Sequence, residues 1–316
     1  MSQSYGKGAD PQAGAGEPNY TSSTDSVCPR HPDRPSLIRC QRCDRPACVE
    51  CQRRAAVGVQ CVDCVSEAEH SQRQSAPRTV VGAEPVRTLP VVTYTIMGLC
   101  AVIFALQFIG LDRTLSQWFM FAPFRSLAMP WTFLTSGFLH GGIAHVGLNL
   151  YALWAVGQFL ERALGHWRYL AVFLVSVFGG HTAVLLLSSI GTDSWFTGTV
   201  GASGGLFGLF GALLILQRRL GAESTQVLIL IVLNFVIGFL YPGISWQGHL
   251  GGLIAGAATV GLFFATRPTV EPGADRVALA KKSAMRHGAV VAGLMVLMLA
   301  ACAVKWWLAA TTVYLA

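Results

Sequence analysis

Charged residues are scarce in this chain. Asp, Glu, Lys and Arg make up 12% of the 316 residues, whereas 53% are hydrophobic; average proteins carry roughly 25% charged residues. The first 88 residues are polar, and the apolar residues are concentrated after Leu89. The composition therefore predicts two unlike parts, a soluble N-terminal region and a polytopic membrane domain.

Carboxylates are few in the apolar part. Between Leu89 and Pro268 the acidic residues are Asp112, Glu161, Asp193 and Glu223. A transporter would be expected to show charge pairs in its membrane helices or an internal repeat, and the sequence shows neither. No carboxylate is close in sequence to the candidate catalytic residues described below. We therefore expect a catalytic dyad, although Asp193 could in principle complete a triad.

Residues 1–20 contain no apolar stretch, so no secretory signal peptide is predicted. The net charge of +7 comes largely from Lys and Arg that flank apolar runs, where such residues are topology signals. We therefore expect no nucleic-acid partner. The bias of Lys and Arg toward alternate loops predicts a multi-pass protein of the plasma membrane, with a cytoplasmic N-terminus and an external C-terminus.

Seven apolar stretches are predicted to cross a hydrocarbon core of about 30 Å as helices. The fourth is short, and we expect its helix to start partway into the membrane with Ser203 in its first turn. The fold class is an all-α membrane protein with a six-helix core, one extra C-terminal helix and a small N-terminal zinc-binding domain. The stretches lie near residues 91–110, 145–162, 168–190, 203–218, 225–242, 247–265 and 288–309.

The domain boundaries follow from these shifts in composition. Gly, Ser and Ala dominate the first segment, which is expected to be disordered, and a Ser-, Gln- and Pro-containing segment reads as a linker. The predicted parts are a disordered tail at 1–26, a zinc-binding module at 27–65, a linker at 66–89, a six-helix core at 90–266, a cytoplasmic loop at 267–287 and a seventh transmembrane helix at 288–316.

Seven of the nine cysteines fall between Cys28 and Cys64. With one histidine they form four pairs at ligand spacing, which suits two tetrahedral structural zinc ions that supply folding energy. A disulfide framework is the rival interpretation; the odd thiol count, the histidine and the missing export signal argue against it. The pairs are Cys28 and His31, Cys40 and Cys43, Cys48 and Cys51, and Cys61 and Cys64.

A serine and a histidine open two of the apolar runs. Ser203 lies within Gly201-Ala202-Ser203-Gly204, and His249 lies forty-six residues later. Polar side chains at membrane depth mark function by default. With the predicted topology both residues lie at similar depth, so His249 can serve as the base that activates the Ser203 hydroxyl.

Neighbouring residues could support this pair. Gly248, Gly252 and Gly256 share one face of the sixth predicted helix, which could pack closely against the fourth. Phe207, one helical turn after Ser203, could stack on the imidazole of His249. These residues would bring nucleophile and base together and hold the base in place.

A third polar group comes from the second predicted helix. His145 and Asn149 are four residues apart and share a helical face, and His140 precedes them. His145 and Asn149 can donate hydrogen bonds to an oxyanion, alongside the backbone N–H of Ser203. A lone histidine such as His181 is instead interpreted as a packed or hydrogen-bonded residue.

These motifs resemble the rhomboid family of intramembrane serine proteases over about residues 91–266. The resemblance implies a six-helix core, a Ser203–His249 dyad without a catalytic cofactor, and hydrolysis of peptide bonds in or near transmembrane segments of proteins in the lipid bilayer. It also matches Glu161 and Arg162 to a structural acidic–basic pair. Many relatives have arginine where this chain has Thr132, which leaves the anchoring of that loop open. The alternative is a catalytically silent rhomboid-like binder or chaperone.

The cysteine cluster resembles B-box-type zinc fingers, which implies cross-braced binding and a cytoplasmic protein partner. In that scheme Cys28, His31, Cys48 and Cys51 share one zinc ion. Cys40, Cys43, Cys61 and Cys64 share the other. Sequential pairing of the ligands remains open.

Overall fold

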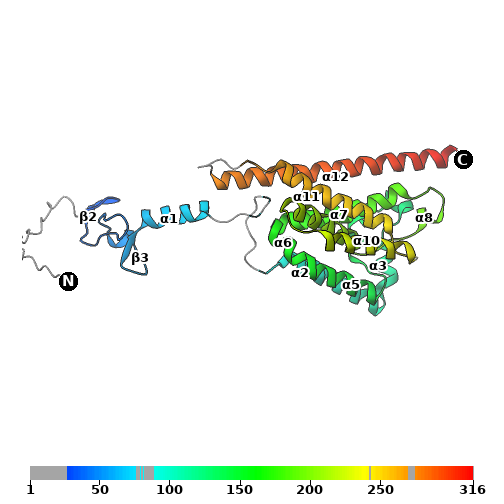
Figure 1. Ribbon diagram of the computed structural model, residues 1–316, viewed down its shortest axis with the longest axis horizontal. Coiled ribbons are helices and arrows are strands. Elements are labelled where there is room, and N and C mark those ends of the chain that lie inside the picture. The colour runs from blue at the N-terminus through cyan, green and yellow to red at the C-terminus, as the bar shows by residue number, and fades with distance from the viewer. Residues whose placement is uncertain are drawn as a thin grey trace, which may run out of the picture. The chain divides into compact units, whose positions relative to one another are not determined.

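The computed structural model describes residues 27–75, 79, 81, 89–241, 243–269 and 275–315 (Figure 1). The chain divides into two compact units, Met1–Ala76 and Pro77–Ala316. The predicted disordered tail, residues 1–26, lies outside the described residues, and so do residues 76–78, 80 and 82–88 of the predicted linker.

The N-terminal unit has little secondary structure and an unusual core. Its two hairpins are antiparallel, and its buried core consists of cysteine side chains and Ala47. Helix α1 runs through Ser75 and so extends into the predicted linker, because the polar segment contains good helix formers. The elements are β1 (Val27–Cys28), β2 (His31–Pro35), β3 (Gln52–Arg54), β4 (Val59–Cys61) and α1 (Val62–Ser75).

The second unit is all-helical in its described residues apart from one isolated β-bridge. Each of the seven predicted apolar segments coincides with a helix. The long elements are α2 (Val91–Leu106) continued by α3 (Asp112–Phe119), α5 (Ile143–Ala152) continued by α6 (Gln158–Leu164), α7 (His166–Leu187), α9 (Ser203–Arg219), α10 (Thr225–Leu240), α11 (Trp246–Thr266) and α12 (Arg276–Leu315). Short helices α4 (Thr132–Thr135) and α8 (Asp193–Phe196) lie in the loops.

Five helical segments in the described part of the chain are long and apolar enough to cross a membrane. Helix α10 is apolar but shorter, and α9 has 17 residues and begins at Ser203. The prediction of an all-α, multi-pass membrane protein is therefore confirmed. The five segments are Val91–Phe119, Ile143–Leu164, His166–Leu187, Trp246–Ala265 and Val277–Thr312.

Helix α12 starts earlier than the predicted seventh span. It begins at Arg276, within the predicted loop 267–287, and includes Lys281, Lys282 and Arg286. Lys and Arg are good helix formers, so the helix continues past the apolar stretch. In the second unit α12 runs alongside α7 and α11 (Figure 1).

The centre of the second unit is a close packing of α7, α9 and α11. A Cβ atom built on Gly252 would lie 2.0 Å from the carbonyl oxygen of Gly204, and one on Gly256 would lie 2.1 Å from that of Gly208. Helices α9 and α11 therefore touch backbone to backbone, as small residues permit in membrane bundles. This confirms the predicted packing for these two glycines, whereas a Cβ on Gly248 would point toward Ser245 and α7.

A buried carboxylate caps the first helix of the bundle. Glu161 is fully buried, and its oxygens accept hydrogen bonds from the backbone N–H groups of Val92 and Thr93 at 3.0 and 2.8 Å. The Thr93 hydroxyl donates to it at 2.7 Å, and His166 Nδ1 lies 2.5 Å away. Arg162 is exposed. Glu161 thus caps α2, since the first N–H groups of a helix need acceptors, and the match of Glu161 and Arg162 to an acidic–basic pair stays a prediction.

We predict that Gly252→Ala destabilises the bundle by about 2 kcal/mol, because the new methyl group overlaps the α9 backbone. Gly261→Ala is the matched control on the same helix, since nothing lies within 4 Å of its Cβ position. It should be neutral or slightly stabilising. Thermal unfolding in detergent measures both, and equal midpoints for the two variants would contradict the close packing.

Candidate functional site

Ser203 follows a short extended segment that is tied to a neighbouring loop. Helix α9 begins at Ser203, and the N–H of Gly201 donates to the carbonyl oxygen of Ser136 at 2.9 Å. Gly201 has a φ of +124°, a conformation that favours glycine. A Cβ atom there would also lie 2.6 Å from His145 Nε2. Both features require glycine two residues before Ser203.

His249 lies in the first turn of α11. Ser245 caps this helix by accepting the N–H of Gly248 at 3.2 Å. His249 Nε2 lies 2.9 Å from Ser203 Oγ, and the imidazole is 8% exposed. Its ring stacks on Phe207, with centroids 4.1 Å apart and planes 11° apart. The structure therefore places serine and histidine in hydrogen-bond contact, with the imidazole held against an aromatic ring.

The Ser203–His249 contact assigns the proton on the neutral imidazole. If Ser203 Oγ–H donates to Nε2, the ring proton is on Nδ1. Nδ1 is buried and has no hydrogen-bond partner within the described residues. In that same part of the chain, no carboxylate is hydrogen-bonded to either ring nitrogen of His249. Asp193 belongs to α8 and is exposed, so it does not complete a triad here.

Two further predicted residues, His145 and Asn149, belong to α5. The N–H of Gly141 donates to His145 Nδ1 at 3.3 Å, so the neutral ring carries its proton on Nε2, which faces Gly201. Asn149 is buried, and its Nδ2 donates to the carbonyl of His145 at 2.8 Å. His145 Nε2–H is thus directed toward the segment before Ser203. Asn149 keeps one N–H free of that bond.

The predicted supporting residue His140 is buried beside His145, with ring centroids 5.1 Å apart. The backbone N–H of His140 donates to Gln107 Oε1 at 3.0 Å. Gln107 was not among the predicted residues, although an amide in an apolar helix was a signal that could have found it. Gln107 also donates to Asp112 at 2.8 Å and so links the end of the first span to His140.

The loop between α3 and α5, residues 120–142, is anchored without the arginine that many relatives have at position 132. Arg125 donates to the carbonyls of Ser116 at 3.0 Å and Gln117 at 2.9 Å, and also to that of Met120. Trp131 Nε1 donates to Trp118 O at 2.8 Å. A cation at the end of α3 suits the unpaired carbonyls there. We call this segment the α3–α5 loop.

His181 is hydrogen-bonded on both ring nitrogens, in line with its interpretation from sequence. Nδ1 lies 2.8 Å from the carbonyl of Phe133, and Nε2 lies 2.9 Å from Ser136 Oγ. Ser136 is the residue whose carbonyl accepts Gly201 N–H. His181 therefore supports the α3–α5 loop at the point where that loop meets the segment before Ser203.

The N-terminal unit contains two clusters that could hold metal ions. Ligand atoms within each cluster all lie within 4.8 Å of one another. Tetrahedral zinc with Zn–S bonds of about 2.3 Å places sulfur atoms about 3.8 Å apart, and Cys43 Sγ lies 3.7 Å from Cys61 Sγ. The clusters are Cys28, His31, Cys48 and Cys51, and Cys40, Cys43, Cys61 and Cys64.

The pKa values of these thiols are also consistent with a cation bound in each cluster. Hydrogen bonding by the backbone of Cys48, aided by His31, lowers the pKa of Cys28 to about 6. Burial and the neighbouring thiols raise the pKa of Cys51 to about 11, and burial raises that of Cys64 to about 12. Four adjacent thiolates cannot coexist without a positive charge among them, and a bound metal ion would supply it.

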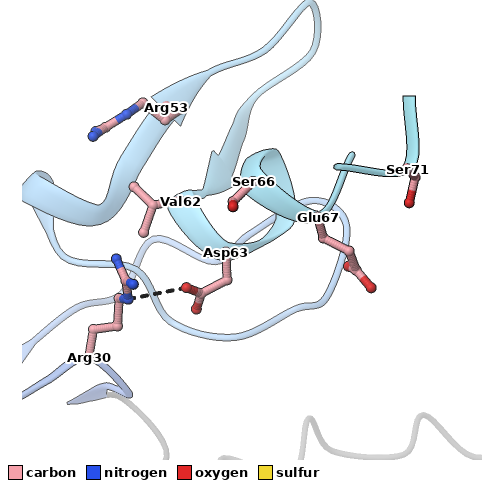
Figure 2. Close-up of a pocket in the computed structure, with 7 residues that line it drawn as sticks. All are labelled: Arg30, Arg53, Val62, Asp63, Ser66, Glu67 and Ser71. Carbon is pink, nitrogen blue, oxygen red and sulfur yellow. Dashed lines mark ion pairs between the residues drawn. The ribbon is translucent and has the colours of Figure 1, made fainter. Parts of the chain in front are cut away.

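A surface hollow of about 610 Å³ lies beside α1 in the N-terminal unit. Figure 2 shows Arg30 pointing toward Asp63, and the two side chains are 3.1 Å apart. Arg53 and Glu67 also line the hollow. Since both signs of charge alternate here, the hollow does not form an anion-binding surface by itself.

The comparisons with known proteins agree with the fold. Residues 127–266 match the Rhomboid domain. The chain is 39% identical to Rhomboid protease GluP of Bacillus subtilis (strain 168) over 140 residues, which are 42% of this chain and 26% of that protein. It is 37% identical to RHOMBOID-like protein 5 of Arabidopsis thaliana over 134 residues, 40% of this chain and 41% of that protein. Residues 127–266 of the chain therefore carry a rhomboid domain.

The similarity also includes a relative named as inactive. Inactive RHOMBOID-like protein 8 of Arabidopsis thaliana is 32% identical over 133 residues, 40% of this chain and 36% of that protein. In all three relatives the matched region spans less than half of the relative's length. The match to the Rhomboid domain therefore leaves catalytic activity to be argued from the geometry of the site.

We predict that Phe207→Ala slows the reaction of Ser203 with a fluorophosphonate, a reagent for activated serines, by about 10- to 100-fold, because a loosened imidazole is misplaced. Phe207→Tyr keeps the stacked ring and should react at nearly the wild-type rate. The rate of labelling is followed by in-gel fluorescence. An alanine variant as fast as wild type would mean that stacking does not orient His249.

Proposed function

We propose that this protein is an intramembrane serine endopeptidase that hydrolyses peptide bonds in or near transmembrane segments of other membrane proteins. The observation that carries the proposal is the 2.9 Å contact between His249 Nε2 and Ser203 Oγ. It joins two helices within a bundle whose apolar surface suits lipid. A serine needs such a base before it can act as a nucleophile.

In the proposed reaction His249 Nε2 accepts the proton of Ser203 as Oγ attacks the scissile carbonyl. The imidazolium then protonates the leaving amine, and neutral His249 activates the water that hydrolyses the acyl-enzyme. No catalytic cofactor enters these steps. The oxyanion would form near the free N–H groups at the start of α9, where the helix dipole favours negative charge. His145 and Asn149 would donate further hydrogen bonds to it.

The substrate would enter the site laterally from the lipid, past α10. The packing of α10 against the bundle supports this route. Helix α10 exposes many apolar side chains. It contacts the bundle through aromatic rings, with Phe235 5.2 Å from Phe207 and Phe239 5.2 Å from Trp246. Val227 and Ile231 of α10 also pack with Phe207 and Phe210 of α9. A displacement of α10 that separates these apolar contacts would open a path to Ser203. Residues that destabilise helices would help a substrate unwind there.

The proposed setting is the plasma membrane, with the N-terminus in the cytoplasm and the C-terminus outside, as the distribution of Lys and Arg predicts. The second candidate function is that of a catalytically silent membrane-protein binder, which the similarity to an inactive relative favours. The contact between Ser203 and His249 favours the enzyme, since a silent binder does not need it.

We predict that wild-type protein in detergent is labelled by a fluorophosphonate, whereas Ser203→Ala and His249→Ala are not. Alanine at 203 removes the nucleophile, and alanine at 249 removes its base; for a comparable hydrolase, either loss costs on the order of 10⁶ in kcat. Ser194→Ala, at an exposed residue of the short helix α8, is the control. Equal labelling of all four proteins, or none in wild type, would favour the silent binder.

For the N-terminal unit we propose a cross-braced module that binds two structural zinc ions and a cytoplasmic protein partner. One ion would be held by Cys28, His31, Cys48 and Cys51, and the other by the four remaining cysteines of the module. The zinc ions would supply cross-links in place of an apolar core, because the buried side chains are the ligands themselves.

We predict two zinc ions per chain in the purified full-length protein by elemental analysis. Cys51→Ser and Cys64→Ser should each retain one ion or fewer, since each removes a ligand from a different cluster. Cys100→Ala, in the membrane unit, should retain two. Retention of two ions by both serine variants would reject the ligand assignment.

A further inference from the structure

We propose that α12 helps to set the geometry of the catalytic site and that Trp306 is a positioning residue for Ser203. The inference rests on the proposed protease function, which supplies the reaction to be positioned. It starts from the polar contacts that α12 makes near its two ends, and from the loop that one of those ends touches.

The first anchor of α12 is a buried polar cluster against α7 and α11. Arg168 Nε donates to His287 Nδ1 at 2.8 Å, and its Nη2 donates to Ser283 at 3.3 Å. His287 Nε2 lies 3.0 Å from the carbonyl of Phe263. All three polar side chains are buried. Buried polar groups satisfied in this way hold the helices in one register.

The second anchor lies where α7 ends. Lys305 Nζ donates to the carbonyls of Leu186 at 3.2 Å and Ser188 at 2.7 Å. A cation is favourable at the C-terminal end of a helix, where carbonyls lack partners. Beside it Trp306 Nε1 donates to Ser126 Oγ at 2.9 Å, and Ser126 belongs to the α3–α5 loop.

The distance between the two anchors along α12 is close to the thickness of the hydrocarbon core of a membrane. His287 and Lys305 are 18 positions apart, which corresponds to about 27 Å along a helix. That length is close to the roughly 30 Å of a hydrocarbon core. The polar contacts therefore lie near the two ends of the apolar stretch, and α12 is fastened to the bundle at both.

Trp306 is connected to Ser203 through the loop that it touches. Ser126 is fully buried and donates to the carbonyl of Pro123 at 2.8 Å. The Trp306 ring lies edge-on to Phe133, with centroids 6.1 Å apart, and Phe133 packs on Phe121 at 4.7 Å. Helix α12 therefore contacts the α3–α5 loop through Trp306, and Phe121 lies at the start of that loop.

That loop meets the segment before Ser203 through backbone hydrogen bonds. The N–H of Thr199 donates to the carbonyl of Phe121 at 2.8 Å, and the N–H of Gly201 donates to that of Ser136 at 2.9 Å. These two bonds set the path of the chain into α9. A shift of the loop would move Ser203 relative to His249, and misplacement of reacting groups lowers the reaction rate.

The neighbouring tryptophan provides a matched control. Trp307 is 64% exposed, and it is not among the described side chains that pack with Trp306 on the buried cluster of Phe121 and Phe133. Trp306→Phe removes the N–H but keeps a ring against Phe133. Ser126→Ala removes the same hydrogen bond from the loop side. Trp307→Phe makes the same chemical change without touching the loop.

The experiment measures the maximal rate of fluorophosphonate labelling of Ser203 in the full-length protein, at saturating probe. Trp306→Phe and Ser126→Ala should each slow it about three- to tenfold, the effect of one neutral hydrogen bond. The double variant should be no slower than the slower single, because both changes break the Trp306–Ser126 hydrogen bond, and the Ser126–Pro123 bond is lost in Ser126→Ala as it is in the double variant. Trp307→Phe should match wild type. Equal rates for the Trp306 and Trp307 variants, or multiplied effects in the double variant, would overturn the proposal.

Amide hydrogen exchange separates this inference from the proposed function. The N–H groups of Thr199 and Gly201 should exchange faster in Trp306→Phe than in wild type. In Trp307→Phe their exchange rates should equal those of wild type. If wild-type Ser203 proves unreactive, the protease function fails, yet faster exchange would still support the link to the loop. Unchanged exchange in both variants would refute the link whether or not the protein is an enzyme.

Discussion

The close backbone contact of α9 and α11 is the constraint on which the site depends. No side chain larger than hydrogen fits at Gly252 or Gly256, because the carbonyls of Gly204 and Gly208 already occupy the space. This approach sets the separation of the two helices that carry Ser203 and His249 in their first turns. With the helices so close, a serine and an imidazole can meet directly at 2.9 Å.

A second constraint comes from lipid, which offers no hydrogen bonds to polar groups. In the bundle, polar side chains form hydrogen bonds with the ends of helices and with the loop backbone. Glu161 caps the start of α2, and Lys305 caps the end of α7. His181 bridges two groups of the α3–α5 loop. Each contact satisfies polar groups and at the same time fixes a helix end or a loop of the bundle.

The sequence was sufficient to predict the helices, since hydropathy depends on composition over about twenty residues. The small residues of α11 indicated its packing face, and Phe207 indicated a ring one turn after Ser203. Other contacts could not be predicted, because they depend on irregular backbone. The Ser136–Gly201 bond and the Arg125 anchor join loops with no periodic pattern. Glu161 was matched to Arg162 by adjacency, whereas its partners Val92 and Thr93 are nearly seventy residues away.

In the described residues no carboxylate is hydrogen-bonded to His249, and this has an electrostatic consequence. At rest, an alcohol and a neutral imidazole carry no formal charge, so the membrane exacts no Born penalty for burying them. Proton transfer would then create two opposite charges a few ångströms apart, in surroundings less polarisable than water. Their mutual attraction would be stronger there than in solvent, and no third ion would compete for the imidazolium.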